Sequence, residues 1–187
     1  MAWKTAAQVK ALTGKDIFLV ITQGHLDRST YAFAADVHLG KLARVLRMLG
    51  FDTLYSNSWS CADLLAISSA QDRILLSRNI RFASRPEITA IVIASDNYRE
   101  QLKQVEREVS VVKNSAPFTR CLACNGTLAA VSKETVVTIL KEQTQRHYQD
   151  FWQCNSCRKV YWKGPHYNRM LQFIQSFHVT SEQQRGS

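Results

Sequence analysis

Long hydrophobic runs and acidic residues are both scarce in this sequence. The longest apolar stretches, such as residues 17–21 and 90–94, have only the length of a strand and predict no transmembrane helix. Because Lys4 is not followed by an apolar segment, we expect no secretory signal and a cytoplasmic protein. The 15 acidic residues are outnumbered by 24 lysines and arginines, and the net charge of +9 favours a polyanionic partner such as nucleic acid. Many basic proteins bind no nucleic acid, so the charge alone does not decide this.

Cysteine, in contrast, is present in a pattern. Four of the five cysteines form two Cys-x-x-Cys pairs: Cys121, Cys124, Cys154 and Cys157. Two such pairs bring four thiolates around one Zn²⁺ in a zinc ribbon, and four protein ligands leave the ion no open position for catalysis. We therefore expect a structural zinc, with disulfides, a redox motif or chance spacing as the alternatives. The fifth cysteine, Cys61, is predicted to be a small core residue.

Apolar strands alternate with amphipathic helices after residue 30, whereas residues 1–30 contain no motif. We expect strands at residues 31–35, 52–55, 73–77, 90–94 and 109–112, and helices at residues 39–49, 60–70, 97–108 and 166–177. Gly50 is expected to end the first helix, and Ser60 to cap the second. The alternation predicts an α/β fold with a parallel sheet flanked by helices, followed by the small C-terminal zinc ribbon.

Acidic or amide side chains stand where the predicted strands end. They are Asp36, Asp63, Asn79 and Asp96, of which Asp63 lies in a helix and the others follow strands. In an open α/β sheet, ligands bind beyond the carboxyl ends of the strands. Carboxylates gathered there would bind Mg²⁺ or Mn²⁺, and such ions activate water for phosphodiester hydrolysis. Helix capping explains Asp63 and Asp96 about equally well, so spacing alone leaves the nuclease interpretation open.

Four segments together resemble one known family. The run DVHLGKLARVLRMLGFD at residues 36–52 resembles the signature of the Mut-seven C-terminal RNase family, and three further segments match in order. They are residues 73–79 (RILLSRN), 118–125 (FTRCLACN) and 154–166, which join the second cysteine pair to VYWKGPH. The resemblance implies a PIN-like nuclease domain over residues 31–116 and a zinc ribbon with a terminal helix over 117–179. It leaves residues 1–30 as an N-terminal extension of unclear role and 180–187 as a disordered tail.

The resemblance also implies an activity and its residues. It implies a magnesium- or manganese-dependent ribonuclease whose ligands are Asp36, Asp63 and Asp96. Asn79 stands where the family usually has aspartate. An amide oxygen accepts a metal without adding charge, so we expect reduced or altered activity. The alternative is a catalytically degenerate nuclease fold that acts as an RNA-binding or protein-interaction module.

Basic residues then acquire a possible role in RNA binding. On the helix after Asp36 they recur every three positions, and in the ribbon they alternate with aromatic residues. The basic residues are Lys41, Arg44 and Arg47 on the helix, and Arg158, Lys159 and Lys163 in the ribbon. Basic and aromatic side chains together suit single-stranded RNA, because bases stack on rings beside the phosphate contacts. The alternatives are a solvated helix face and, for the rings Tyr161 and Trp162, a cover over the small core of the ribbon.

Overall fold

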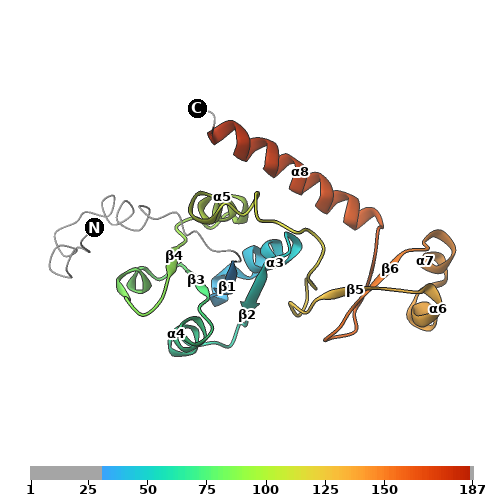
Figure 1. The fold of residues 1–187 in the computed structure, drawn as a ribbon, viewed down its shortest axis with the longest axis horizontal. Helices are drawn as coiled ribbons and strands as arrows, with labels where there is room; N and C mark the ends of the chain where they lie inside the picture. The colour runs from blue at the N-terminus through green and yellow to red at the C-terminus, as the bar shows by residue number, and fades with distance from the viewer. Residues whose placement is uncertain (1–30, 186–187) are drawn as a thin grey trace.

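The computed structural model describes the backbone of residues 31–185 and the side chains of residues 31–177. Figure 1 shows a sheet with helices on both sides, a smaller sheet beyond it, and a long C-terminal helix that runs from the smaller sheet back over the larger part. The predicted N-terminal extension, residues 1–30, lies outside the described residues. None of the described helices has the length and hydrophobicity that a membrane-spanning segment needs.

The larger sheet is parallel, as the sequence predicts. Its strands are β1 (Ala32–Ala35), β2 (Asp52–Tyr55), β3 (Ile74–Ser77) and β4 (Ala90–Val92), in the order β2-β1-β3-β4. Ala34 pairs with Leu54 on one side and with Leu75 on the other. Because β1 and β3 are neighbours at the centre, the residues that follow them meet at one edge of the sheet, where α/β folds bind ligands.

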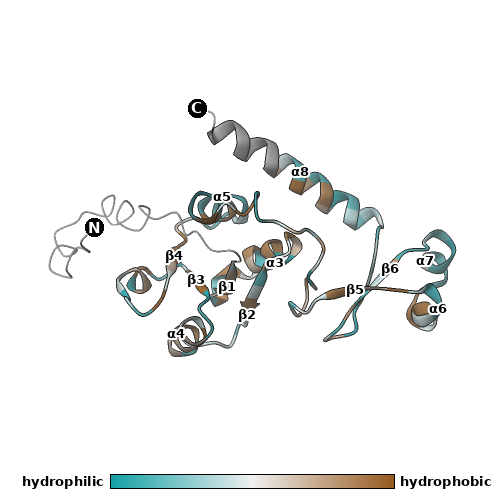
Figure 2. Cartoon of the chain, in the orientation of Figure 1, coloured by the Kyte–Doolittle hydropathy of each residue, from teal (hydrophilic) through white to brown (hydrophobic). Residues whose placement is uncertain are grey.

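Alternate residues of the central strands face opposite layers of helix. The helices are α3 (Gly40–Met48), α4 (Cys61–Ala70) and α5 (Tyr98–Val109), with 3-10 turns η1 (Val37–Leu39) and η2 (Ile80–Ser84). Phe33 and Leu76 are buried with α3 and α5 in one cluster, whereas Ala34 and Leu75 are buried with α4 and η2 in another. Burial on both faces explains why β1 and β3 are almost continuously apolar, whereas the edge strand β2 is largely hydrophilic in Figure 2.

Two backbone positions decide how helices end. Gly50 follows α3 at φ +95°, and a Cβ there would lie 2.1 Å from the carbonyl oxygen of Ala116, so only glycine fits. Ser110 ends α5 in the left-handed region at φ 48°. The chain then turns, so the strand predicted at residues 109–112 is wrong. Val111 is buried all the same, because the turn places it in the core beside α3 and α5.

The C-terminal part contains an antiparallel sheet with a helical insert. Its elements are β5 (Leu128–Val131), α6 (Lys133–Val136), η3 (Val137–Ile139), α7 (Glu142–His147), β6 (Phe151–Cys154) and β7 (Val160–Trp162), with the strands in the order β5-β6-β7. Val136, Leu140 and Phe151 form a small core under the insert. The insert accounts for the long separation of the two cysteine pairs.

The last helix, α8 (Pro165–Arg185), connects the smaller sheet back to the larger one. Ile174 and Phe177 are buried in the same cluster as α3 and α5, and Met170 and Phe173 pack against it. The expectation that this helix packs back on the fold is confirmed. The backbone of residues 180–185, which the sequence predicts as a tail, continues α8.

Candidate active site and metal centre

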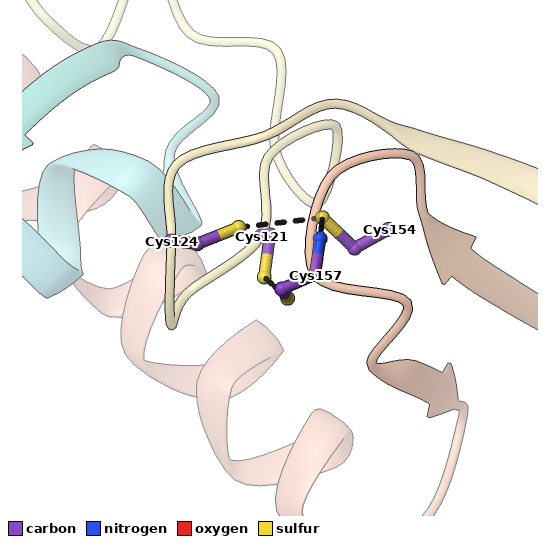
Figure 3. A group of neighbouring side chains, drawn as sticks. All are labelled: Cys121, Cys124, Cys154 and Cys157. Carbon is purple, nitrogen blue, oxygen red and sulfur yellow. Dashed lines mark hydrogen bonds between the residues drawn. The ribbon is translucent and has the colours of Figure 1, made fainter.

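The four paired cysteines converge on one point. Their sulfur atoms all lie within 4.8 Å of one another, with 3.6 Å between Cys121 and Cys157 and 3.4 Å between Cys124 and Cys154 (Figure 3). A tetrahedral Zn²⁺ with bonds of 2.3 Å places its sulfur ligands about 3.8 Å apart. The four thiols therefore suit a tetrahedral metal ion such as zinc, and the fold is compatible with a zinc ribbon.

Two tight turns carry the sulfurs. Asn125 adopts φ 72° and Arg158 adopts φ 61°, so each turn closes through a left-handed residue just after its cysteine pair. Gly126 lets the two turns approach, because a Cβ there would lie 2.9 Å from the Cys154 sulfur. The N–H of Cys121 donates to the carbonyl of Gly126 at 2.7 Å and fixes the first turn.

The thiols also differ in their readiness to ionise. Burial raises the pKa of Cys121, but hydrogen bonds from Tyr161 and from backbone N–H groups outweigh it and lower that pKa to about 6. For Cys157, the N–H of Lys159 favours the thiolate, yet lost hydration and the neighbouring sulfurs raise the pKa to about 12. A cation among them would favour four thiolates, because metal binding displaces the protons.

The first cysteine turn is hydrogen-bonded to β2, the edge strand of the larger sheet. Arg47 donates from Nε to the carbonyl of Thr53 at 2.9 Å and from Nη1 to the carbonyl of Ala123 at 3.0 Å. Asn125 accepts from the N–H of Thr53 at 2.9 Å, and its Nδ2 donates to Asp52 at 2.7 Å. Both backbone groups of Thr53 are thereby paired at a sheet edge that would otherwise be open.

This contact corrects the predicted place of Arg47, which is not on an exposed cationic face. Arg47 is only 6% exposed, whereas Lys41 and Arg44 are exposed. A spacing of three residues falls short of the 3.6 residues in a turn, so two such steps rotate Arg47 toward the buried side of α3.

A small ion cluster reinforces the same contact. Asp52 pairs with Arg73 at 2.7 Å and with Arg120 at 3.4 Å. Burial raises the pKa of Asp52, but hydrogen bonds from Arg73 and Asn125 and the charge of Arg120 outweigh it, so the pKa lies below its usual value.

The carboxyl ends of β1 and β3 border a pocket with a volume of about 310 Å³. It is lined by Asp36, Val37, His38, Trp59, Cys61, Leu64, Ser77, Arg78, Asn79 and Phe82. Of the predicted site residues, Asp36 and Asn79 therefore share one pocket. Cys61 is exposed at its rim, so the prediction that it is a core residue is wrong.

Asp36 is the buried carboxylate of this pocket, at 6% exposure. Its Oδ1 caps η1 by accepting the N–H of His38 at 2.9 Å. Its Oδ2 accepts the hydroxyl of Ser77 at 2.5 Å and the N–H of Arg78 at 2.9 Å. These three donors hold the carboxylate in a fixed orientation at the strand end.

The other predicted ligands do not gather around Asp36. Asp63 is exposed, and its Oδ2 accepts both the N–H and the hydroxyl of Ser60 in a capping box, which lowers its pKa. Asp96 pairs with Arg78 and is 81% exposed in its side chain. It does not cap α5 either, because Asn97 does so. Among residues 31–177, only the four cysteines form a group of three or more close metal-binding side chains.

The pocket nevertheless fits one hard cation. Mg²⁺ is commonly held by one or two carboxylates, with water and substrate phosphate in the other positions. Within the described residues, Oδ1 of Asp36 accepts only the N–H of His38, and Oδ1 of Asn79 accepts only the N–H of Arg81 at 3.1 Å, so each oxygen keeps a lone pair there. This donor set suits a single, weakly held ion and does not suit a pair of ions held by three carboxylates.

Residues 31–174 match the family model of the Mut7-C RNAse domain. The chain belongs to the Mut7-C RNAse domain family. The match spans the parallel sheet, the pocket, the cysteine cluster and the first part of α8. Membership indicates a nuclease-like function. No curated protein and no solved structure matches the chain.

Most basic residues singled out in this Mut7-C domain are on the surface. Lys41, Arg44, Arg158, Lys159 and Lys163 are exposed, so each can reach a polyanion.

The four ribbon rings have partners within the described part of the chain, and Trp162 packs on Tyr148 with 6.3 Å between ring centroids. Tyr161 bonds the Cys121 sulfur at 3.0 Å, and Tyr167 packs on Phe118. Lys163 lies over the ring of Trp152, and Trp162 is 37% exposed.

Ser77, His38 and Trp59 are among the pocket residues of the Mut7-C domain that were not identified from the sequence. Ser77 stands at the end of a buried strand, the same signal that points to Asp36. His38 is two residues beyond Asp36 in the matching run. Trp59 has no local signal, because only the fold brings the start of α4 beside the ends of β1 and β3.

Proposed function

We propose that this protein hydrolyses phosphodiester bonds of RNA at the pocket formed by the ends of β1 and β3, and that it needs Mg²⁺ or Mn²⁺ to do so. The observation that carries the proposal is the buried, hydrogen-bonded carboxylate of Asp36 in a pocket shared with Asn79, within a Mut7-C RNAse domain. The net charge of +9 supports a polyanionic substrate.

Asp36 and Asn79 are the residues that would hold the catalytic ion. A divalent ion there supplies Lewis-acid activation of water and charge stabilisation at the phosphate. Ser77 keeps Asp36 aligned through its 2.5 Å hydrogen bond, and the same Oγ accepts the N–H of Asn79 at 3.0 Å. Ser77 therefore links the Asp36 carboxylate to the backbone of Asn79.

Cationic side chains near the pocket bind the RNA backbone in this proposal. Lys41 and Arg44 are exposed on α3, directly after η1, and Arg78 lines the pocket itself. Asp96 orients Arg78 through their ion pair rather than binding the metal. The His38 ring lies at the rim, where it can donate a hydrogen bond to a phosphoryl oxygen.

The cysteine cluster holds a structural zinc in this proposal. All four positions of the ion are filled by protein, so the ribbon supports the fold and offers Arg158, Lys159 and Lys163 to the RNA. Zinc and the catalytic ion then have separate roles at separate places.

The test is cleavage of labelled single-stranded RNA with Mn²⁺, with Mg²⁺ and with EDTA, for the wild type, Asp36→Asn and Asp150→Asn. Asp150 is an exposed acid in the ribbon and serves as the matched control. We expect metal-dependent cleavage that Asp36→Asn abolishes and Asp150→Asn preserves. Cleavage by folded Asp36→Asn at the wild-type rate would refute the assignment.

A degenerate nuclease fold that binds RNA or another protein is the second candidate. It is favoured by the separation of Asp36, Asp63 and Asp96, which leaves one carboxylate in the pocket. It predicts no cleavage with either metal and RNA affinity that falls steeply with salt, because phosphate contacts release counterions. Salt-insensitive or absent RNA binding would instead indicate a protein partner.

A further inference from the structure

One wall of the pocket is apolar and aromatic, which phosphate hydrolysis alone does not require. Trp59, Leu64 and Phe82 line it beside the strand ends. Phe82 and Leu64 are buried at 4% and 2% exposure, whereas Trp59 is half-buried and packs against them. The indole therefore rests on the core on one side and remains accessible on the other.

The local fold explains an apolar residue at position 59, but not an indole. Ser60 is the N-cap of α4, so Trp59 precedes the cap and Leu64 stands four positions into the helix. An apolar pair at these two positions is a hydrophobic staple, and leucine would serve it as well as tryptophan. The start of the helix therefore needs an apolar side chain at position 59, but it does not need the flat aromatic ring of tryptophan.

Polar groups with unused hydrogen-bonding capacity border the same pocket. Nδ2 of Asn79 has only a contact of 4.0 Å with the Cys61 sulfur within the described part of the chain. The exposed His38 ring makes no hydrogen bond in that part either. A pocket with an aromatic wall and a few polar groups at its rim is typical of sites for flat, polar ligands.

We propose that the pocket binds one unpaired nucleobase of the RNA, stacked on Trp59, with its hydrogen-bonding edge toward His38 and Asn79. The base is bound beside Asp36, so its own phosphate is presented to that carboxylate. This inference rests on the proposed function and adds a requirement for single-stranded substrate, because a paired base cannot enter a pocket closed by Phe82 and Leu64.

The experiment measures binding in EDTA, where no cleavage occurs, of a short fluorescent single-stranded RNA and of an abasic ribose-phosphate oligomer of equal length. The variants are Trp59→Leu, which keeps the staple, Trp59→Phe, which keeps a ring, and Ile80→Ala as control. Ile80 is an exposed apolar residue of η2 that does not line the pocket.

We expect Trp59→Leu to weaken RNA binding about 5- to 150-fold, the range for loss of one base–aromatic stack. Trp59→Phe should retain most of the affinity, and Ile80→Ala all of it. The abasic oligomer should bind the wild type more weakly than RNA, and equally to all variants. Equal RNA affinity of folded Trp59→Leu and wild type, or equal loss in Trp59→Leu and Trp59→Phe, would overturn the proposal.

A second measurement uses the wild-type protein, so it does not depend on the variants folding. The indole N–H resonance of Trp59 should shift when RNA is added and stay in place with the abasic oligomer. An unchanged resonance in the presence of bound RNA would overturn the base pocket.

The outcomes that refute the base pocket differ from those that refute the proposed hydrolysis. Cleavage that requires Asp36 but is unaffected by Trp59→Leu refutes the pocket alone. Binding that depends on Trp59 without cleavage under any metal refutes the hydrolysis alone.

Discussion

Arg44 and Arg47 lie one turn apart on α3 but have different environments. Arg44 is exposed, whereas the guanidinium of Arg47 is bonded to carbonyl groups of β2 and of the first cysteine turn. We expect Arg44→Ala to reduce RNA affinity and to lower the slope of log affinity against log salt by about one, as for one lost phosphate contact. Fluorescence anisotropy at several salt concentrations measures this.

The matched variant is Arg47→Met, in which the buried carbonyls lose their donor. We expect its free energy of unfolding to fall by about 3 kcal/mol, measured by urea denaturation. Its RNA affinity should not change at temperatures where it is folded. If Arg47→Met were instead as stable as the wild type but bound RNA more weakly, Arg47 would be an RNA-binding residue.

At Asn79, the difference between an amide and a carboxylate should change metal affinity and the cleavage rate. Its Oδ1 accepts the N–H of Arg81, and aspartate would keep that cap while adding a negative charge. We expect Asn79→Asp to bind Mn²⁺ more tightly and to cleave RNA faster than the wild type. Calorimetric metal titration and the cleavage rate test this, and Asn79→Ala, which lacks the oxygen, should do neither.

Single residues were predictable only where the chain carries their signal locally. Asp36 stands at the end of a buried strand, and the structure places it in the pocket. Asp63 has two local explanations, and the structure shows the capping box. Trp59 and the burial of Arg47 depend on contacts between segments far apart in the sequence, and no local pattern encodes such contacts.

Among the elements, β2 is hydrogen-bonded at its outer edge to the first cysteine turn, about 70 residues later in the chain. Its Thr53 bonds through both backbone groups to Asn125 and Arg47, beside the cysteine cluster. We expect Cys154→Ser to lose zinc and to speed hydrogen exchange at the amide of Thr53, because the turn that presents Asn125 is no longer held. Metal analysis and exchange monitored by NMR would show both effects.

The amide of Ile93, bonded to the carbonyl of Ser77 at 2.8 Å just beyond the strand at the other edge of the sheet, is the internal control. Its exchange should change less than that of Thr53. Equal changes at both amides would mean global unfolding rather than a local effect on β2. A Cys154→Ser protein that keeps its zinc would contradict the four-cysteine site.

Helices and strands were predicted well where the hydrophobic pattern and the capping residues indicate the same element. The four strands of the parallel sheet and the helix that begins after Ser60 are confirmed, because buried strands are apolar throughout and caps are local. The segment at residues 109–112 has the same apolar composition as a strand, but the left-handed Ser110 turns it away from the sheet. Composition cannot distinguish a buried turn from a buried strand.

At the scale of the whole molecule, acid should loosen the junction between the two sheets. The pKa of Asp52 is lowered in the folded protein, so its ion pairs contribute stability above the usual carboxyl pKa and lose it as the pH falls through the lower folded value. We expect Asp52→Asn to reduce the free energy of unfolding by roughly 1–3 kcal/mol at pH 7. That difference from the wild type should begin to shrink as the pH falls to the ordinary carboxyl pKa of about 4, and it should vanish only below the lower folded pKa.

Denaturation of both proteins across the pH range measures the difference, and any loss of zinc in acid affects the two alike. Asp150→Asn, an exposed acid outside the junction, should show no difference at any pH. A gap between wild type and Asp52→Asn that persists into acid would show that the ion cluster does not stabilise the junction.

The path of α8 sets the order in which the protein can be completed during synthesis. Ile174 and Phe177 belong to the core that α3 and α5 build, yet they are translated after the whole cysteine-bearing segment. A ribosome releases the chain from its N-terminal end, and domains generally fold as they emerge. Here α8 is synthesised after both sheets, so the apolar surface that Ile174 and Phe177 cover stays open until this helix emerges.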